Sequence, residues 1–181
     1  IMYNRFLAYA VHLFTILGVY VSFLAIEAAV EKNISLVFLF LAIALFIDGI
    51  DCSLARWADV KTFAPKINGE ILDNIIDFLS YVFIPAFVIH SFEFVSNELS
   101  DFAAFIILVT SCFTFANNNL KTKDNYFSGF PALWNIVLLY FYILDTAPVS
   151  YICIILILAI LTFTPIKFAL HFRVKNLRSL N

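Results

Sequence analysis

The chain has 181 residues, of which 63% are hydrophobic and only 13% are charged, and its formal net charge is −2. Soluble domains are nearer half apolar and a quarter charged, so this chain has too little polar surface for a water-soluble globule. Its mean hydropathy of +0.96 is typical of an integral membrane protein. No basic tract indicates binding to nucleic acid, and the three cysteines lie too far apart to suggest a disulfide framework or a zinc pair.

Apolar runs follow one another along the whole chain, and each is a candidate transmembrane helix. A spanning helix needs ~20 mostly apolar residues, and continuous rather than alternating runs favour helices over barrel strands. The predicted spans are residues 8–28, 34–54, 71–92, 101–117, 131–146 and 149–168. The sequence therefore predicts an all-α integral membrane protein, a bundle of about six transmembrane helices forming a single domain over residues 1–181.

The basic residues lie almost entirely on one side of this predicted bundle. With six spans, the N-terminus, the second and fourth loops and the C-terminus lie on the same side of the membrane. The opposite side has a single basic residue, Lys32. The shared side carries Arg5, Arg56, Lys61, Lys66, Lys121, Lys123, Lys167, Arg173, Lys175 and Arg178. Because Lys and Arg are enriched in cytoplasmic loops, both termini are predicted to be cytoplasmic.

Four aspartates lie at the cytoplasmic ends of the second and third predicted helices. Asp48 and Asp51 are three residues apart, and Asp73 and Asp77 are four apart, so each pair shares one helical face. The connecting loop makes the helices antiparallel neighbours, which brings the two acidic faces to the same depth. An acid at the centre of a membrane helix costs ~2.5–3.5 kcal/mol, and four facing acids also repel each other.

Two interpretations of this acidic pattern remain open from the residues themselves. The acids either lie in wet headgroups and cap helices, or they bind divalent cations such as Mg²⁺ or Mn²⁺, which prefer oxygen ligands. The matched faces favour the cations, and the neighbouring Arg56 suggests a phosphate or pyrophosphate substrate. A divalent-cation transporter would use the same acids, but it would need them at the bilayer midplane.

The spacing of these residues resembles the motif of the CDP-alcohol phosphatidyltransferase family. That motif runs Asp, two residues, Asp-Gly, two residues, Ala-Arg, a spacer, Gly, three residues, Asp, three residues, Asp. The corresponding positions here are Asp48, Asp51, Cys52, Ala55, Arg56, Gly69, Asp73 and Asp77, so seven of eight match. The chain departs from the motif at Cys52, which replaces a glycine, and in the spacer "WADVKTFAPKIN", which is longer than is usual.

The resemblance implies an activity and a role for each motif residue. The longer spacer and the segment "KTKDNYFSGFPALWN" are similar to family members that transfer the phosphatidyl group of CDP-diacylglycerol to choline, giving phosphatidylcholine and CMP. Asp48, Asp51, Asp73 and Asp77 are implied to bind two Mn²⁺ or Mg²⁺ ions, and Asp77 also to act as the general base. The implied CDP-diacylglycerol-binding residues are Cys52, Ala55, Arg56 and Gly69.

The resemblance also carries expectations about the setting of the protein. Members of this type are bacterial inner-membrane proteins in contact with membrane lipid, with the active site facing the cytoplasm, and a homodimer is expected because the family is commonly dimeric. Such members usually continue with further hydrophobic helices, so the chain is expected to be truncated at its C-terminus. An inactive relative, with Cys52 impairing the site, is the alternative to an enzyme.

The acceptor is the least specified part of the prediction. Choline is a quaternary ammonium, which protein sites hold over aromatic rings. The candidate acceptor residues are Tyr81, Tyr126, Phe127 and Trp134. The scarcity of intramembrane basic residues disfavours phosphorylated alcohols, although serine, inositol and glycerol phosphate stay open as acceptors. His12 is interpreted as a structural residue at the membrane interface.

Overall fold

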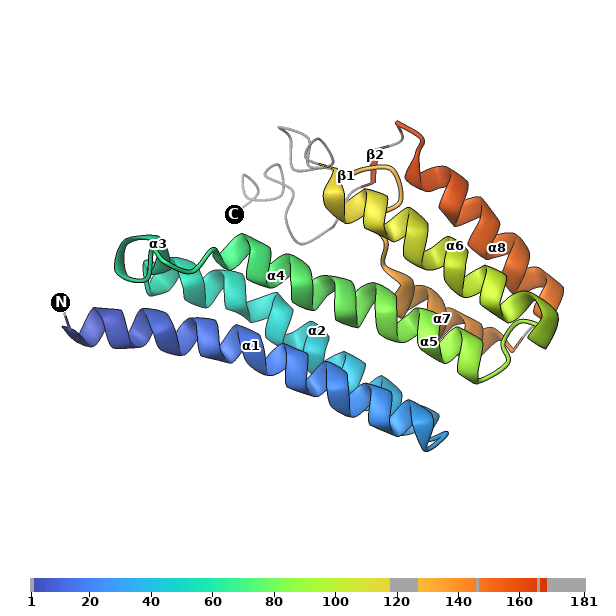
Figure 1. Ribbon diagram of the computed structural model, residues 1–181, viewed down its shortest axis with the longest axis horizontal. Coiled ribbons are helices and arrows are strands. Elements are labelled where there is room, and N and C mark those ends of the chain that lie inside the picture. Colours follow the sequence, from blue (N-terminus) through green and yellow to red (C-terminus); the bar gives the residue numbers. More distant parts are fainter. Residues whose placement is uncertain (1, 118–126, 146, 166, 169–181) are drawn as a thin grey trace, which may run out of the picture. The chain divides into compact units, whose positions relative to one another are not determined.

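The computed structural model describes residues 2–117, 127–145, 147–165 and 167–168, and these are almost entirely helical (Figure 1). The chain divides into two compact units, residues 1–84 and 85–181. The first contains α1 (Met2–Val30), α2 (Ile34–Trp57), α3 (Val60–Phe63), α4 (Gly69–Asp77) and the π-helix η1 (Phe78–Phe83). The chain continues through α5 (Ile84–Ser91), α6 (Asn97–Ala116), β1 (Phe127–Ser128), α7 (Trp134–Leu144), α8 (Pro148–Thr162) and β2 (Lys167–Phe168).

Four helical segments in the described part of the chain are long and apolar enough to cross a membrane. They are α1, α2, the continuous helix Gly69–Ser91 and α6, which confirms the first four predicted spans as helices. Helix α7 has 11 residues and α8 has 15, both fewer than the ~20 of a full span, so the count of six stays a prediction. The expected span 149–168 is wrong at its end, because α8 stops at Thr162, shortly before the helix-breaking Pro165.

The first unit is built on the close packing of α1 against α2 and α4. Small side chains dominate the buried face of α1, at Ala8, Val11, Thr15, Gly18, Ser22, Ala25 and Ala29. Small residues let helix backbones approach closely in membrane proteins. At Gly18 the approach leaves no space for a side chain, since an added Cβ would stand 2.8 Å from Ile76 Cγ2. Large apolar side chains of α1 point outward, as a lipid-facing surface requires.

The loop between α2 and α4 is fixed against the beginning of α1. A small buried cluster does this, and it consists of Ala8, Val11, Ala58, Val60 and Ala64. Helix α4 then begins at a capping residue, Asn68, whose side-chain oxygen accepts hydrogen bonds from the backbone N–H groups of Glu70 (3.1 Å) and Ile71 (3.2 Å). The cap and the packed loop together set the level at which α4 starts beside the end of α2.

In the second unit, α6 packs against α8, and β1 pairs antiparallel with β2. Trp134 is fully buried, and its indole N–H donates to the Ser111 hydroxyl at 2.9 Å. The loop before α7 passes so close to α8 that a Cβ at Gly129 would clash with the Thr162 carbonyl oxygen. Gly129 has φ +89°, a conformation that glycine adopts without strain.

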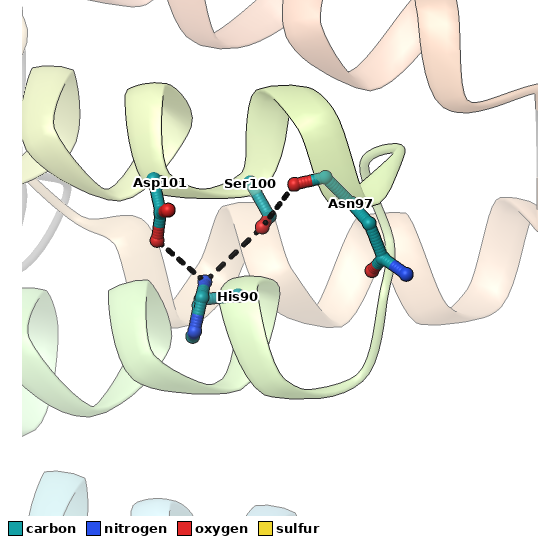
Figure 2. A network of polar contacts seen from close by, with 4 residues as sticks. All are labelled: His90, Asn97, Ser100 and Asp101. Carbon is teal, nitrogen blue, oxygen red and sulfur yellow. Dashed lines mark hydrogen bonds and ion pairs between the residues drawn. The ribbon is translucent and has the colours of Figure 1, made fainter.

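A polar group joins α5 to α6 (Figure 2). His90 Nδ1 lies 3.2 Å from Ser100 Oγ and 3.5 Å from an Asp101 carboxylate oxygen. The Ser100 hydroxyl also donates to the Asn97 carbonyl at 3.0 Å. Both side chains approach the same ring nitrogen, whereas a Ser-His-Asp triad uses both nitrogens of its histidine. The contacts of His90 therefore link α5 to α6.

Candidate active site

The four motif aspartates meet between the C-terminal half of α2 and helix α4. One carboxylate oxygen each from Asp48, Asp73 and Asp77 lie within 4.8 Å of one another. A second group within the same limit combines Asp51 and Asp73 with the sulfur of Cys52. Asp73 belongs to both groups, so the structure brings together all four acids that the sequence singles out. Two ligand groups with one shared carboxylate can hold a pair of metal ions.

The donor atoms of this cluster fit a divalent cation. Asp51 is 5% exposed, and its Oδ1 has no hydrogen-bond partner. Asp77 Oδ1 is likewise buried without a partner. Buried carboxylate oxygens are costly unless they are paired or bind a metal. Because four of the five donor residues offer oxygen, Mg²⁺ or Mn²⁺ would satisfy these atoms and neutralise the repulsion between the acids.

Tyr81 supports the cluster from the π-helix that follows Asp77. Its hydroxyl donates a hydrogen bond to Asp48 Oδ2, and its side chain is only 7% exposed. The π-helix has a local cause, because Pro85 lacks an N–H and its ring would clash with the Tyr81 carbonyl in a regular α-helix. The backbone N–H of Ile84 bonds to the Leu79 carbonyl instead, five residues back. Single π-helical turns of this kind occur often at functional sites.

Arg56 lies on the last turn of α2, beside the acids but not paired with them. Its Nε donates to the Cys52 carbonyl at 3.2 Å, and one terminal nitrogen lies 3.4 Å from Ser53 Oγ. The side chain is exposed, and no ion pair joins it to an acid in the described residues. Its guanidinium is therefore accessible to a phosphate group. Ala55, on the same turn, is half-buried.

Helix α1 adds two polar residues to the site that sequence reasoning missed. Thr15 lies beside Asp51, and its hydroxyl donates to the Val11 carbonyl at 3.3 Å. His12, expected at the membrane interface, is buried at 3% exposure, and its ring lies against Gly69. The signal for both was present in the sequence, since they follow the three-and-four spacing of the small residues on the buried face of α1.

The aromatic residues assigned to the acceptor have different positions. Tyr81 lies at the acid cluster, where its hydroxyl is engaged by Asp48. Trp134 is buried in the second unit and bonded to Ser111. Tyr126 and the side chain of Phe127 lie outside the described residues. Tyr81 is thus the candidate that the described first unit places at the aspartates, and the acceptor assignment as a whole stays a prediction.

Most of the chain is similar to a known protein family. Residues 5–166 match the CDP-alcohol phosphatidyltransferase family. The chain belongs to that family. A CDP-alcohol phosphatidyltransferase carries out divalent-metal-dependent phosphoryl transfer, which agrees with an acid cluster able to bind metal. The chain is therefore a transferase of phospholipid synthesis with apolar helices long enough to span a membrane.

Several bacterial members of the family are similar to this transferase over nearly its whole length. The phosphatidylcholine synthase of Pseudomonas aeruginosa is 43% identical, over 98% of this chain and 75% of its own length. The enzyme of that name from Mesorhizobium japonicum is 41% identical, over 96% of this chain and 65% of its own length. The phosphatidylcholine synthase of Borreliella burgdorferi is 37% identical, over 98% of this chain and 76% of its own length. No solved structure is significantly similar to the chain.

Proposed function

We propose that this chain transfers the phosphatidyl group of CDP-diacylglycerol to choline, giving phosphatidylcholine and CMP. The observation that carries this proposal is the meeting of four motif aspartates from α2 and α4 in a chain whose relatives are named phosphatidylcholine synthase. In this reaction a new bond forms between the choline oxygen and the phosphorus that bears diacylglycerol. The bond from that phosphorus to the CMP oxygen breaks, and CMP leaves.

Asp48, Asp51 and Asp73 hold the metal ions in this scheme, and Asp77 takes the proton from the choline hydroxyl. Bound Mn²⁺ or Mg²⁺ supplies charge neutralisation on the diphosphate. Asp77 suits the role of base because its buried Oδ1 has no other partner. Tyr81 orients Asp48, and the exposed guanidinium of Arg56 grips a phosphate.

The membrane setting follows from the charges and from the substrate. We extend the proposal to about six spans, both termini in the cytoplasm, and an active site facing the cytoplasm from the bacterial inner membrane. The single domain and the homodimer stay predictions. The acids lie near the end of α2 that carries Arg56 and is followed by Lys61, which supports a site close to the cytoplasmic surface. A lipid-linked nucleotide needs that depth, because its acyl chains stay in the bilayer.

An acceptor panel tests the proposal. Purified protein in lipid vesicles with Mn²⁺ is supplied with CDP-diacylglycerol and either choline, serine, inositol or glycerol 3-phosphate, and the lipid product is measured. We expect phosphatidylcholine only, with Asp77→Asn lowering its formation by about a hundredfold or more. Glu70→Gln, an exposed acid on the same helix, is the matched control and should keep full activity.

Each contrary result has a definite meaning. Product from another alcohol would retain the chemistry and overturn the choline assignment. No product from any acceptor, with CDP-diacylglycerol still bound, would favour an inactive relative. Equal turnover by wild type and Asp77→Asn would remove Asp77 from the role of base.

A further inference from the structure

His12 is a buried histidine with an unsatisfied ring nitrogen. Its side chain is 3% exposed, and Nε2 is inaccessible to solvent and without a hydrogen-bond partner. Nearly all buried polar groups in proteins are hydrogen-bonded, so an exception calls for a missing partner. The other buried residues on this face of α1 include small ones such as Ala8 and Gly18, so the imidazole is an exception among them.

His12 lies about one helical turn from Asp51 along α1 and about one turn from Asp73 along α4. On α1 it precedes Thr15, which lies beside Asp51. On α4 its ring contacts Gly69, which precedes Asp73 by four residues, and a Cβ at Gly69 would stand 3.3 Å from His12 Cε1. One turn rises ~5.4 Å, so both helices place the imidazole closer to the α2–α4 loop than the carboxylates are.

A ligand that extends from the acid cluster toward this loop therefore passes close to His12. The diphosphate of CDP-diacylglycerol joins an apolar diacylglycerol, which stays in the bilayer, to a polar cytidine, which must extend toward water. An imidazole nitrogen can donate to or accept from a ribose hydroxyl or the polar edge of cytosine. Resting on the function proposed above, we infer that His12 Nε2 binds the cytidine part of the liponucleotide.

The same geometry gives Gly69 a second reason to be glycine. The space that a side chain would take at this position is occupied by the edge of the His12 ring. Gly69 thus allows the imidazole to lie at the beginning of α4, where it positions the nucleotide. His12 does not need to be protonated for this role, because a neutral imidazole can make the hydrogen bond.

Binding of two soluble probes tests the inference directly. CDP contains the nucleotide and the diphosphate, whereas inorganic pyrophosphate contains the diphosphate alone. Affinities are measured by calorimetry on detergent-solubilised protein with Mn²⁺, for wild type, His12→Gln, His12→Asn and His12→Leu. The Gln amide nitrogen mimics Nε2, and the Asn amide nitrogen mimics Nδ1. We expect His12→Asn and His12→Leu to weaken CDP binding about tenfold, His12→Gln less than threefold, and pyrophosphate binding to stay unchanged.

Ser22→Ala is the matched control. Ser22 is also buried on the same face of α1, at 2% exposure, with an unpaired hydroxyl oxygen. It lies ten residues further along the helix, ~15 Å from His12, so its loss should leave both affinities unchanged. Thermal unfolding of each variant reports folding, and if His12→Leu does not fold, the comparison of Gln with Asn still decides the result.

The contrary outcomes separate this inference from the proposed function. Unchanged CDP affinity in all folded His12 variants would overturn it, and equal loss of CDP and pyrophosphate would assign His12 to the acid cluster instead. Normal wild-type binding of CDP without synthesis of phosphatidylcholine would contradict the function but leave the inference standing. A folded wild type that does not bind CDP would contradict both.

A double-mutant cycle tests the reason given for Gly69. Gly69→Ala should weaken CDP binding when His12 is present, because the new methyl group displaces the ring. In a His12→Ala background, Gly69→Ala should weaken CDP binding much less, because removal of the His12 ring leaves space for the new methyl group. Additive effects would overturn the link between the two residues.

Discussion

At the scale of single residues, Tyr81 can act in two ways that one substitution separates. The ring is a candidate surface for choline, and the hydroxyl holds Asp48. Tyr81→Phe keeps the aromatic face but removes the hydrogen bond. If Tyr81 serves Asp48, kcat should fall about tenfold while the KM for choline stays the same. Steady-state kinetics with varied choline measure both quantities.

Tyr81→Leu is the companion variant for this experiment, because it removes the ring as well. A KM for choline that rises only in Tyr81→Leu would assign the ring to the acceptor. Full activity of Tyr81→Phe would contradict the positioning role of the hydroxyl.

Cys52 replaces the motif glycine and brings a soft sulfur ligand to an oxygen-rich site. Its sulfur lies within 4.8 Å of donor oxygens from Asp51 and Asp73. Thiolates favour Zn²⁺ and Cd²⁺ over Mg²⁺ and Mn²⁺. We therefore expect Cd²⁺ to inhibit the wild type at about tenfold lower concentration than Cys52→Gly, measured as CMP release in Mn²⁺. Equal inhibition of the two proteins would show that the sulfur does not reach the bound metal.

At the scale of elements, the small-residue face of α1 determines how closely the first unit packs. Gly18→Ala would place a Cβ 2.8 Å from Ile76 Cγ2, so the helices must move apart. We expect the substitution to destabilise the protein by ~1–3 kcal/mol, with a lower midpoint of thermal unfolding in detergent. Adding Ile76→Ala removes the clashing atom, so Gly18→Ala should destabilise the protein less in that background.

Gly49→Ala is the control for this prediction, because no atom lies within 4 Å of the position of its Cβ. Alanine has the higher helix propensity, so this variant should be as stable as the wild type or more so. A Gly18→Ala protein as stable as Gly49→Ala would contradict the close packing of α1.

The long helices and the acid faces were predictable from the sequence because both depend on local patterns. Continuous apolar runs gave α1 and α2, and the spacing of Asp73 and Asp77 gave a shared face on α4. Features that depend on tertiary contacts were not predictable in this way. His12 is buried because its ring packs against Gly69 of α4, and the indole N–H of the buried Trp134 is paired with Ser111 of α6.

At the scale of the whole molecule, the distribution of basic residues predicts which loops face the cytoplasm. Lys32 follows α1, and Lys61 lies in the short helix α3 after α2; both are exposed. In a variant without other cysteines, Lys32→Cys should react with a membrane-impermeant maleimide in intact bacteria. Lys61→Cys should react only after the inner membrane is opened. The reverse pattern would invert the proposed orientation and move the acids to the periplasmic surface.

The central claim is that the acids of α2 and α4 form a metal-dependent site for transfer to choline. Asp73 is the most informative residue, because it belongs to both ligand groups. The deciding measurement is choline-dependent CMP release from CDP-diacylglycerol in vesicles, with Mn²⁺ titrated into metal-free wild type, Asp73→Asn and Glu70→Gln. We predict no release without metal, saturation of wild type and Glu70→Gln by Mn²⁺, and at least about a hundredfold lower turnover for Asp73→Asn. Release that persists in excess chelator, or Asp73→Asn turnover equal to that of the wild type, would contradict the claim.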